Sequence, residues 1–222
     1  MEELLKHPYC ASFYNDAILL YDRDGDMGKY IAMFKEKFAK KEYLKCRIDK
    51  MSDTMKGQYD IVSSACETGD EADIHCRFAT YTWCLSDALL IRNLSSPTCI
   101  RSLQRLRHID KAITNRIIDA EGHRHLVKSQ LAELISLYEE VWKGDFWTYN
   151  GDKMKWMISN NLEAEAYHGI NIFYMMGIEN SPDKQELFAK WQAVTGKNHI
   201  LPMKSLEEFK NFHSEMMDYL PV

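Results

Sequence analysis

The sequence predicts a mostly α-helical protein, an antiparallel helical bundle with a short N-terminal β segment. After residue 26, apolar residues recur at intervals of three and four, which places them on one face of successive helices. Proline is scarce, so helices can run long between its five positions, which are Pro8, Pro97, Pro182, Pro202 and Pro221. Long helices joined by short connections pack as an antiparallel bundle.

Composition narrows the class of protein. The chain has 222 residues, of which 45% are hydrophobic and 27% charged, so it can bury a substantial core. The net charge of -5 and the lack of a clustered basic surface argue against nucleic-acid binding. Six cysteines show no spacing typical of zinc ligands, which is why we expect reduced thiols and neither a metal nor a cofactor.

Hydropathy gives an expected location. No stretch of about 18 apolar residues occurs, so we expect no membrane-spanning helix. Acidic and basic residues interrupt the first ten positions, which is not typical of a signal peptide. The sequence therefore predicts a cytoplasmic protein.

The N-terminal segment carries the one predicted strand. Residues 17–21 read AILLY and are followed by the turn-forming residues 22–26, DRDGD. We therefore expect a short N-terminal segment, residues 1–25, with one β-strand, and a helical bundle domain at 26–222.

Residues that end or cap helices mark the boundaries within the predicted bundle. Gly69 is expected to end the first long helix and Asp70 to cap the next, while residues 145–151 read as an aromatic loop. The expected helices cover residues 44–66, 74–92, 98–107, 109–120, 127–141 and 154–176, with two more around Trp191 and Phe209.

One predicted helix contains an acidic residue among apolar neighbours. Asp87 lies in a helix that is apolar nearly all round, near Trp83, and a carboxylate there needs a partner or a cavity. Arg77 or Arg92 is the simplest partner; otherwise Asp87 lines a binding pocket. The candidate substrate-binding residues are Trp83, Asp87, Trp147, Glu165, Tyr167 and His168.

The pair Glu165 and His168 has metal-ligand spacing, but no second Glu-x-x-His motif accompanies it, so no metal is expected there. Asp22 and Asp24, after the predicted strand, resemble the first motif of haloacid-dehalogenase-type phosphatases. That chemistry needs Mg²⁺ and further strand-borne acids, and no alternating strands follow.

Two Arg/His pairs offer another interpretation. Arg101 with His108, and Arg116 with His123, lie seven residues apart and therefore share a helix face. This spacing resembles the R-x(4–6)-H signature of HEPN-type ribonucleases. It implies a helical interaction protein or ribonuclease whose pairs face each other across a dimer or partner interface.

A broader resemblance covers residues 15–142. The stretch AILLYDRDGDMGKYIAMF, the break ETGDEADIH and the helix CRFATYTWCLSDALLIRNL follow one another in this order. This order resembles the C-terminal helical domain of kanamycin/lincosamide-type nucleotidyltransferases, which is related to HEPN domains. The resemblance implies a substrate-binding bundle that recognises a small polar molecule.

The chain departs from that family in one respect. The family's catalytic domain carries Gly-Ser followed by an Asp-x-Asp pair, and this sequence has no Gly-Ser dipeptide. The resemblance therefore implies a relative without complete catalytic machinery, and no catalytic residue is assigned. A homodimer or a complex with a partner protein is expected alongside small-molecule binding.

Overall fold

The computed structural model describes residues 1–97, 99–122, 126–196 and 205–221, and these residues are mostly α-helical, as predicted. The helices in chain order are α1 (Glu2–Leu5), α2 (Pro8–Asp16), α3 (Asp26–Phe38), α4 (Lys41–Thr68), α5 (Glu71–Arg92), η1 (Cys99–Arg101), α6 (Ser102–Ile109), α7 (Lys111–Ala120), α8 (Lys128–Val141), α9 (Asp145–Ser159), α10 (Glu163–Glu179), α11 (Lys184–Thr195) and α12 (Leu206–Met217).

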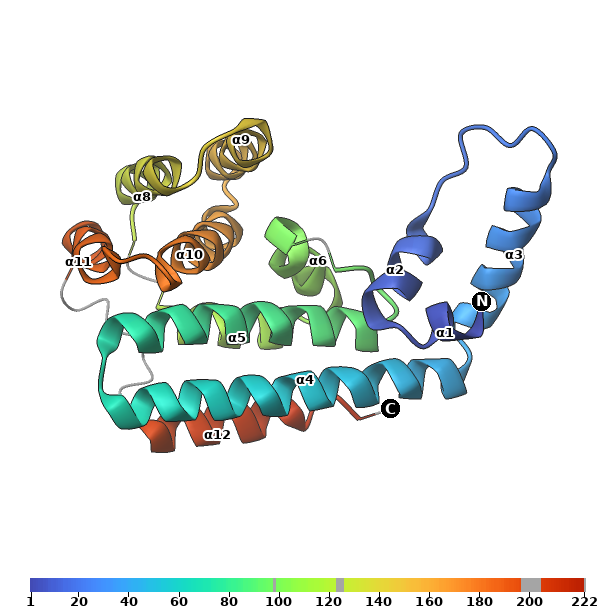
Figure 1. The fold of residues 1–222 in the computed structure, drawn as a ribbon, viewed down its shortest axis with the longest axis horizontal. Helices are drawn as coiled ribbons and strands as arrows, with labels where there is room; N and C mark the ends of the chain where they lie inside the picture. Colours follow the sequence, from blue (N-terminus) through green and yellow to red (C-terminus); the bar gives the residue numbers. More distant parts are fainter. Residues whose placement is uncertain (98, 123–125, 197–204, 222) are drawn as a thin grey trace.

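A long antiparallel pair, α4 and α5, forms the base of the molecule (Figure 1). Gly69 ends α4 in the left-handed region, at φ +71°, which favours glycine because no Cβ is present. The carboxylate of Asp70 accepts a hydrogen bond of 3.1 Å from the amide of Asp73 and so caps α5. Both residues act as the sequence predicts.

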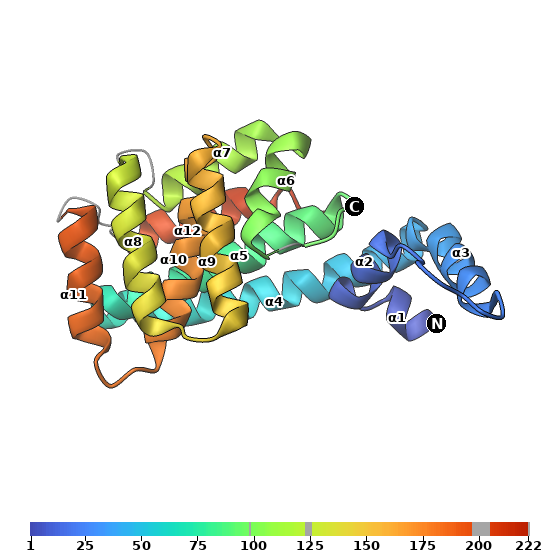
Figure 2. The same ribbon diagram turned by 90° about the horizontal axis from the view of Figure 1, so that it is seen from above.

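The other helices pack on this pair in groups. Helices α8, α9, α10 and α11 lie over one end of α5, α12 runs along α4, and α1, α2 and α3 form an arm at the opposite end (Figures 1 and 2). One apolar cluster joins α4, α5, α6, α7 and α12, and a second joins α5 to α8, α9, α10 and α11. Helix α5 therefore contributes to both cores.

A third, smaller core stabilises the arm. Leu5, Ala11, Phe34, Phe38 and Tyr43 are buried together, so residues on both sides of the predicted boundary at 25/26 share one core. The division into segments 1–25 and 26–222 stays a prediction.

The predicted strand at residues 17–21 is wrong. The segment carries no regular secondary structure, and two helices that were not predicted, α1 and α2, precede it. A strand exists only when a neighbouring strand completes its hydrogen bonds. Among the described residues no second strand is present, so the apolar sequence stays exposed, with Ile18 83% and Leu20 93% accessible.

Two boundaries in the second half also differ from the prediction. Residues 145–151, predicted as an aromatic loop, form the first turns of α9. The helix predicted at 154–176 is divided into α9 and α10, because the chain turns at Asn160 and at Asn161, which has φ +59°. Asparagine tolerates this left-handed conformation better than most residues.

Candidate functional site

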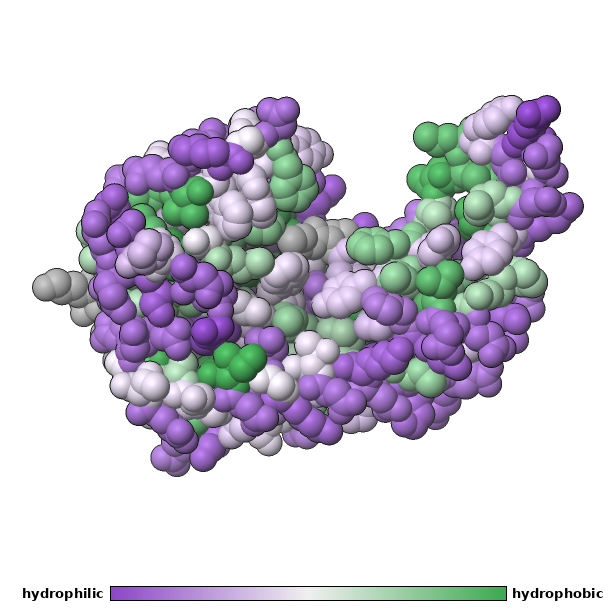
Figure 3. Space-filling view, in the orientation of Figure 1, coloured by the Kyte–Doolittle hydropathy of each residue, from purple (hydrophilic) through white to green (hydrophobic). Residues whose placement is uncertain are grey.

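The candidate site is a cavity of about 450 Å³ between α2, α5, the segment leading into η1, and α9. Its volume falls within the range of small-molecule sites. Figure 3 shows that the surface is hollowed between the arm, which contains α2 and α3, and the block that contains α6 and α9. The lining residues are Tyr9, Phe13, Trp83, Asp87, Pro97, Arg101 and Lys153.

Helix α5 places two of the predicted site residues in this cavity. Trp83 and Asp87 are four residues apart, so they lie one above the other on the same helix face. The structure thus brings these two together as neighbours on one wall. The remaining predicted residues, Trp147, Glu165, Tyr167 and His168, are not among those that line it.

Asp87 is a buried acid that forms no ion pair with a cation among the residues that the structure describes. Its side chain accepts a hydrogen bond of 3.1 Å from the hydroxyl of Ser102, and the residue is 2% exposed. Burial raises the pKa of Asp87 to about 7, although Ser102 and the nearby His168 favour the ionised form. Near neutral pH this carboxyl group can therefore donate a hydrogen bond to a ligand when it is protonated, and accept one from a ligand when it is ionised. The alternative that Arg77 neutralises it does not fit, because Arg77 pairs with Asp73 and Glu179.

Behind the cavity wall, a buried polar network joins α5, the end of α7 and α10. The carboxylate of Glu121 accepts a hydrogen bond of 2.7 Å from the hydroxyl of Thr82 and lies 2.7 Å from Nδ1 of His168. The hydroxyl of Tyr167 donates to the backbone carbonyl of Glu121 at 3.1 Å. His168 and Tyr167 thus hold three helices together, and His168 also acts electrostatically on Asp87.

Glu165 lies on the neighbouring turn of α10. Its carboxylate is buried and forms an ion pair of 3.1 Å with Nε of Arg107 on α6. A buried carboxylate paired in this way fixes the position of α6 against α10. The predicted role of Glu165 in substrate binding stays a prediction.

Trp147 anchors α9 and is not among the residues that line the cavity, so its predicted role in substrate binding stays a prediction. Its ring stacks on that of Trp142, with centroids 3.9 Å apart, and its carbonyl accepts a hydrogen bond of 2.7 Å from Tyr138. The helix fixed in this way carries Lys153 to the cavity instead. Sequence analysis missed Lys153 because residues 145–151 were interpreted as a loop, which left the register of the following helix undefined.

The Arg/His pairs are placed differently from each other. Arg101 lines the cavity, whereas His108 is exposed in the last turn of α6. Arg116 pairs with Glu215 at 2.9 Å and stacks over Phe212, which connects α7 to α12. His123 lies outside the described residues.

Asp22, the first acid after the predicted strand, has a local structural role. The carboxylate of Asp22 accepts a hydrogen bond of 2.6 Å from the amide of Gly28, in the first turn of α3. Within the described residues there is no strand and no group of three or more His, Cys, Asp or Glu side chains that could hold a metal ion. The sheet that phosphatase chemistry requires is thus missing from this part of the chain.

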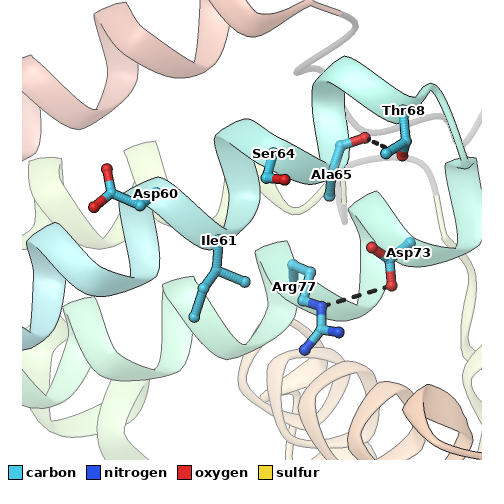
Figure 4. A pocket seen from close by; sticks show the side chains of 7 residues that line it. All are labelled: Asp60, Ile61, Ser64, Ala65, Thr68, Asp73 and Arg77. Carbon is cyan, nitrogen blue, oxygen red and sulfur yellow. Dashed lines mark hydrogen bonds and ion pairs between the residues drawn. The ribbon is translucent and has the colours of Figure 1, made fainter.

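A second hollow, of about 410 Å³, lies between α4 and α5 near the turn that joins them. Figure 4 shows Arg77 beside Asp73 in this groove. The Nε of Arg77 lies 3.6 Å from the carboxylate of Asp73, and Arg77 also pairs with Glu179. Because both carboxylates neutralise this cation, the groove has a weaker charge to bind a ligand than the cavity beside Asp87.

Comparison of the chain with family models, with curated proteins and with solved structures finds no match. Among the described helices, none combines the length and apolar character needed to cross a membrane.

Proposed function

We propose that this chain is a nucleotidyltransferase-like substrate-binding helical domain that recognises a small polar molecule in the cavity beside Asp87. The observation that carries the proposal is the cavity itself. It contains Trp83 and a buried carboxyl group with a pKa of about 7, set among aromatic and cationic side chains. Apolar walls with a few convergent polar groups are typical of small-molecule sites.

The resemblance of residues 15–142 to nucleotidyltransferases supports the same choice. In those enzymes a carboxylate of the helical domain faces a hydroxyl group of the substrate. Asp87 is the carboxyl group that lines this cavity, and its pKa suits exchange of a proton or hydrogen bond near neutral pH. No complete catalytic machinery is proposed for the chain alone.

Thermal denaturation with added ligands tests this proposal. Kanamycin, lincomycin and a set of nucleotides are each added to the full chain. A ligand present at about 100 times its Kd stabilises the folded state by about 2.7 kcal/mol, which raises Tm. The same ligand is then titrated into Asp87→Asn by calorimetry, where we expect binding about tenfold weaker because the charge-assisted hydrogen bond is lost.

The control is Asp60→Asn, which removes the same charge from an exposed site on α4 outside this cavity. It should bind the ligand as tightly as the unmodified protein. If no ligand of the three classes moves Tm, or if Asp87→Asn binds as well as the control, the proposal is wrong.

A second candidate function, a helical protein that associates with itself, is favoured by the exposed segment 17–21. Ile18, Leu20 and Tyr21 are more than 80% exposed, and scattered single apolar residues are far commoner on a surface than such a run. Two copies could cover this surface by pairing around a twofold axis.

Light scattering after size-exclusion chromatography tests the second candidate. The full chain should elute with the mass of a dimer, and Leu20→Asp should shift it to the mass of one chain. Phe146→Asp, which alters an exposed aromatic side chain on α9, is the control and should leave the dimer intact. A monomeric mass for the unmodified protein at high concentration would rule this function out.

A further inference from the structure

The two cations in the cavity differ in their pairing from four arginines elsewhere in the protein. Arg77, Arg105, Arg107 and Arg116 each pair with a carboxylate, whereas Arg101 and Lys153 form no ion pair within the part of the chain that the structure describes. Among the described residues, Arg101 donates a hydrogen bond of 3.2 Å to the neutral side-chain amide of Gln104. Both cations nevertheless line the same cavity.

Two different elements supply these charges to the cavity wall. Arg101 ends η1, and Lys153 lies in the third turn of α9, which is anchored by Trp147. The Nζ of Lys153 lies 4.4 Å from the centre of the Tyr149 ring. This contact favours one position of the lysine side chain and leaves its positive charge without a negative partner. In a chain of net charge -5, two unpaired cations converging on one cavity create a local preference for an anion.

The rest of the cavity wall is largely aromatic. Tyr9 and Phe13 come from α2, and Trp83 comes from α5, so rings line two sides of the space. Flat rings are bound between such walls by stacking, which adds to the gain from burying apolar surface. A volume of about 450 Å³ can hold one planar ring system together with one small charged group.

We infer that the ligand of this cavity is a planar ring compound that carries a phosphate or a carboxylate. The ring lies against Trp83 and the aromatic side chains of α2. The anionic group is bound by Arg101 and Lys153, and Asp87 forms a hydrogen bond to a polar group of the ring system. This inference rests on the proposed function, because it names the class of molecule that the same cavity recognises.

Two matched pairs of compounds test the class of ligand. Adenosine 5′-monophosphate and adenosine differ by a phosphate, and indole-3-acetate and tryptophol differ by a carboxylate. Calorimetric titration of the full chain should give a Kd at least tenfold lower for the anionic member of at least one pair. The preference should weaken as sodium chloride is raised, since salt screens exposed charges.

Variants of the two cations assign the preference to this cavity. In Arg101→Gln and in Lys153→Gln, we expect the anionic member to bind about three- to tenfold more weakly and the neutral member to bind unchanged. The control is Lys155→Gln. Lys155 lies in α9, as Lys153 does, but its Nζ pairs with the carboxylate of Glu139 in α8 at 2.6 Å. This control should keep the full preference for the anionic member.

The outcomes separate this inference from the proposed function. If adenosine, tryptophol or the polycation kanamycin binds in an Asp87-dependent manner and at least as tightly as the anionic compounds, the inference about anions is wrong while the binding cavity stands. An anion preference that survives in the Arg101→Gln/Lys153→Gln double variant also contradicts the inference. If neither these compounds nor the wider set of ligands binds, the proposed function fails with it.

Discussion

Burial sets the chemistry of the single carboxyl group in the candidate cavity. Asp87 receives a hydrogen bond from Ser102, but loss of hydration outweighs that contact and raises its pKa to about 7. The ionised form is therefore unfavourable in the folded protein. Folded proteins keep such groups mostly where they have a use, which is why Asp87 is the strongest single candidate for ligand recognition.

This pKa has a consequence for stability. An unfolded aspartate loses its proton near pH 4, whereas folded Asp87 loses it near pH 7. Between these values the folded state holds a proton that the unfolded state does not, so the contribution of Asp87 to the free energy of unfolding falls as pH rises.

We therefore expect Asp87→Asn to be more stable than the unmodified protein at pH 8, by on the order of 2–4 kcal/mol. At pH 4 the two proteins should be of similar stability, because Asp87 is then protonated in the folded state and still about half protonated in the unfolded state. Urea denaturation at pH 4, 6 and 8 measures the difference. An advantage for Asp87→Asn that stays constant across this range contradicts the shifted pKa.

Arg47 is a second residue whose burial matters. Its guanidinium group is fully buried, donates to the carbonyl oxygens of Leu5 and Phe38 at 2.8 Å each, and lies over the Phe38 ring. Burial lowers its pKa to about 10. This one side chain connects α1 and the end of α3 to α4.

Arg47→Met should lower the free energy of unfolding by about 2–4 kcal/mol, since it leaves two buried carbonyl groups without a donor. Lys45→Met on the same helix removes an exposed cation that pairs with Asp49 and is the control, which should unfold like the unmodified protein. Equal denaturation midpoints for the two variants would show that Arg47 does not stabilise the arm.

The sequence revealed some of these residues and not others. Asp87 was conspicuous in the sequence because it is an acid within an apolar helix, and the predicted roles of Trp83 and Asp87 in ligand binding stay predictions. Arg47 was not, because it lies among Lys45, Cys46 and Asp49 in a stretch whose composition is that of an exposed helix face. Glu121 was not predictable either, because its partners Thr82 and His168 come from distant parts of the sequence.

At the scale of helices, two glycines show how packing decides tolerance. Gly57 lies inside α4 with open space where a Cβ would be. Gly177 lies inside α10 against Val141 and Trp142, where a Cβ would stand 2.8 Å from the indole nitrogen. That nitrogen donates a hydrogen bond of 2.8 Å to the carbonyl of Phe173.

Gly57→Ala should raise the free energy of unfolding by about 0.5–1 kcal/mol, because alanine loses less conformational freedom in a helix. Gly177→Ala should lower it by about 1–3 kcal/mol, because α8 and α10 must move apart. Chemical denaturation of the two variants gives the comparison directly. A stabilising effect of Gly177→Ala would show that α8 and α10 are less closely packed than described.

Helix ends followed the sequence where a residue has a local reason to end a helix. Gly69 and Asp70 act through their own backbone and side-chain geometry, so their roles were predictable. The error at residues 17–21 has the opposite cause. A run such as AILLY indicates only that the segment suits a strand, and pairing depends on another strand that the described residues do not contain.

At the scale of the whole molecule, the α4–α5 pair acts as a base that supports two separate groups of helices (Figure 1). The arm supplies Tyr9 and Phe13 to the cavity, and the opposite group supplies Lys153. The helical class was predictable from apolar periodicity alone. That α2 and α9 line one cavity was not predictable, because this arrangement depends on where α5 places both groups.

The most direct test of the claim that this cavity binds a ligand is to soak crystals of the protein with adenosine 5′-monophosphate and determine the structure. We expect the base to stack against Trp83 and the phosphate to contact Arg101 and Lys153. A nucleotide bound elsewhere, with the cavity empty and unobstructed by neighbouring molecules, would contradict the account.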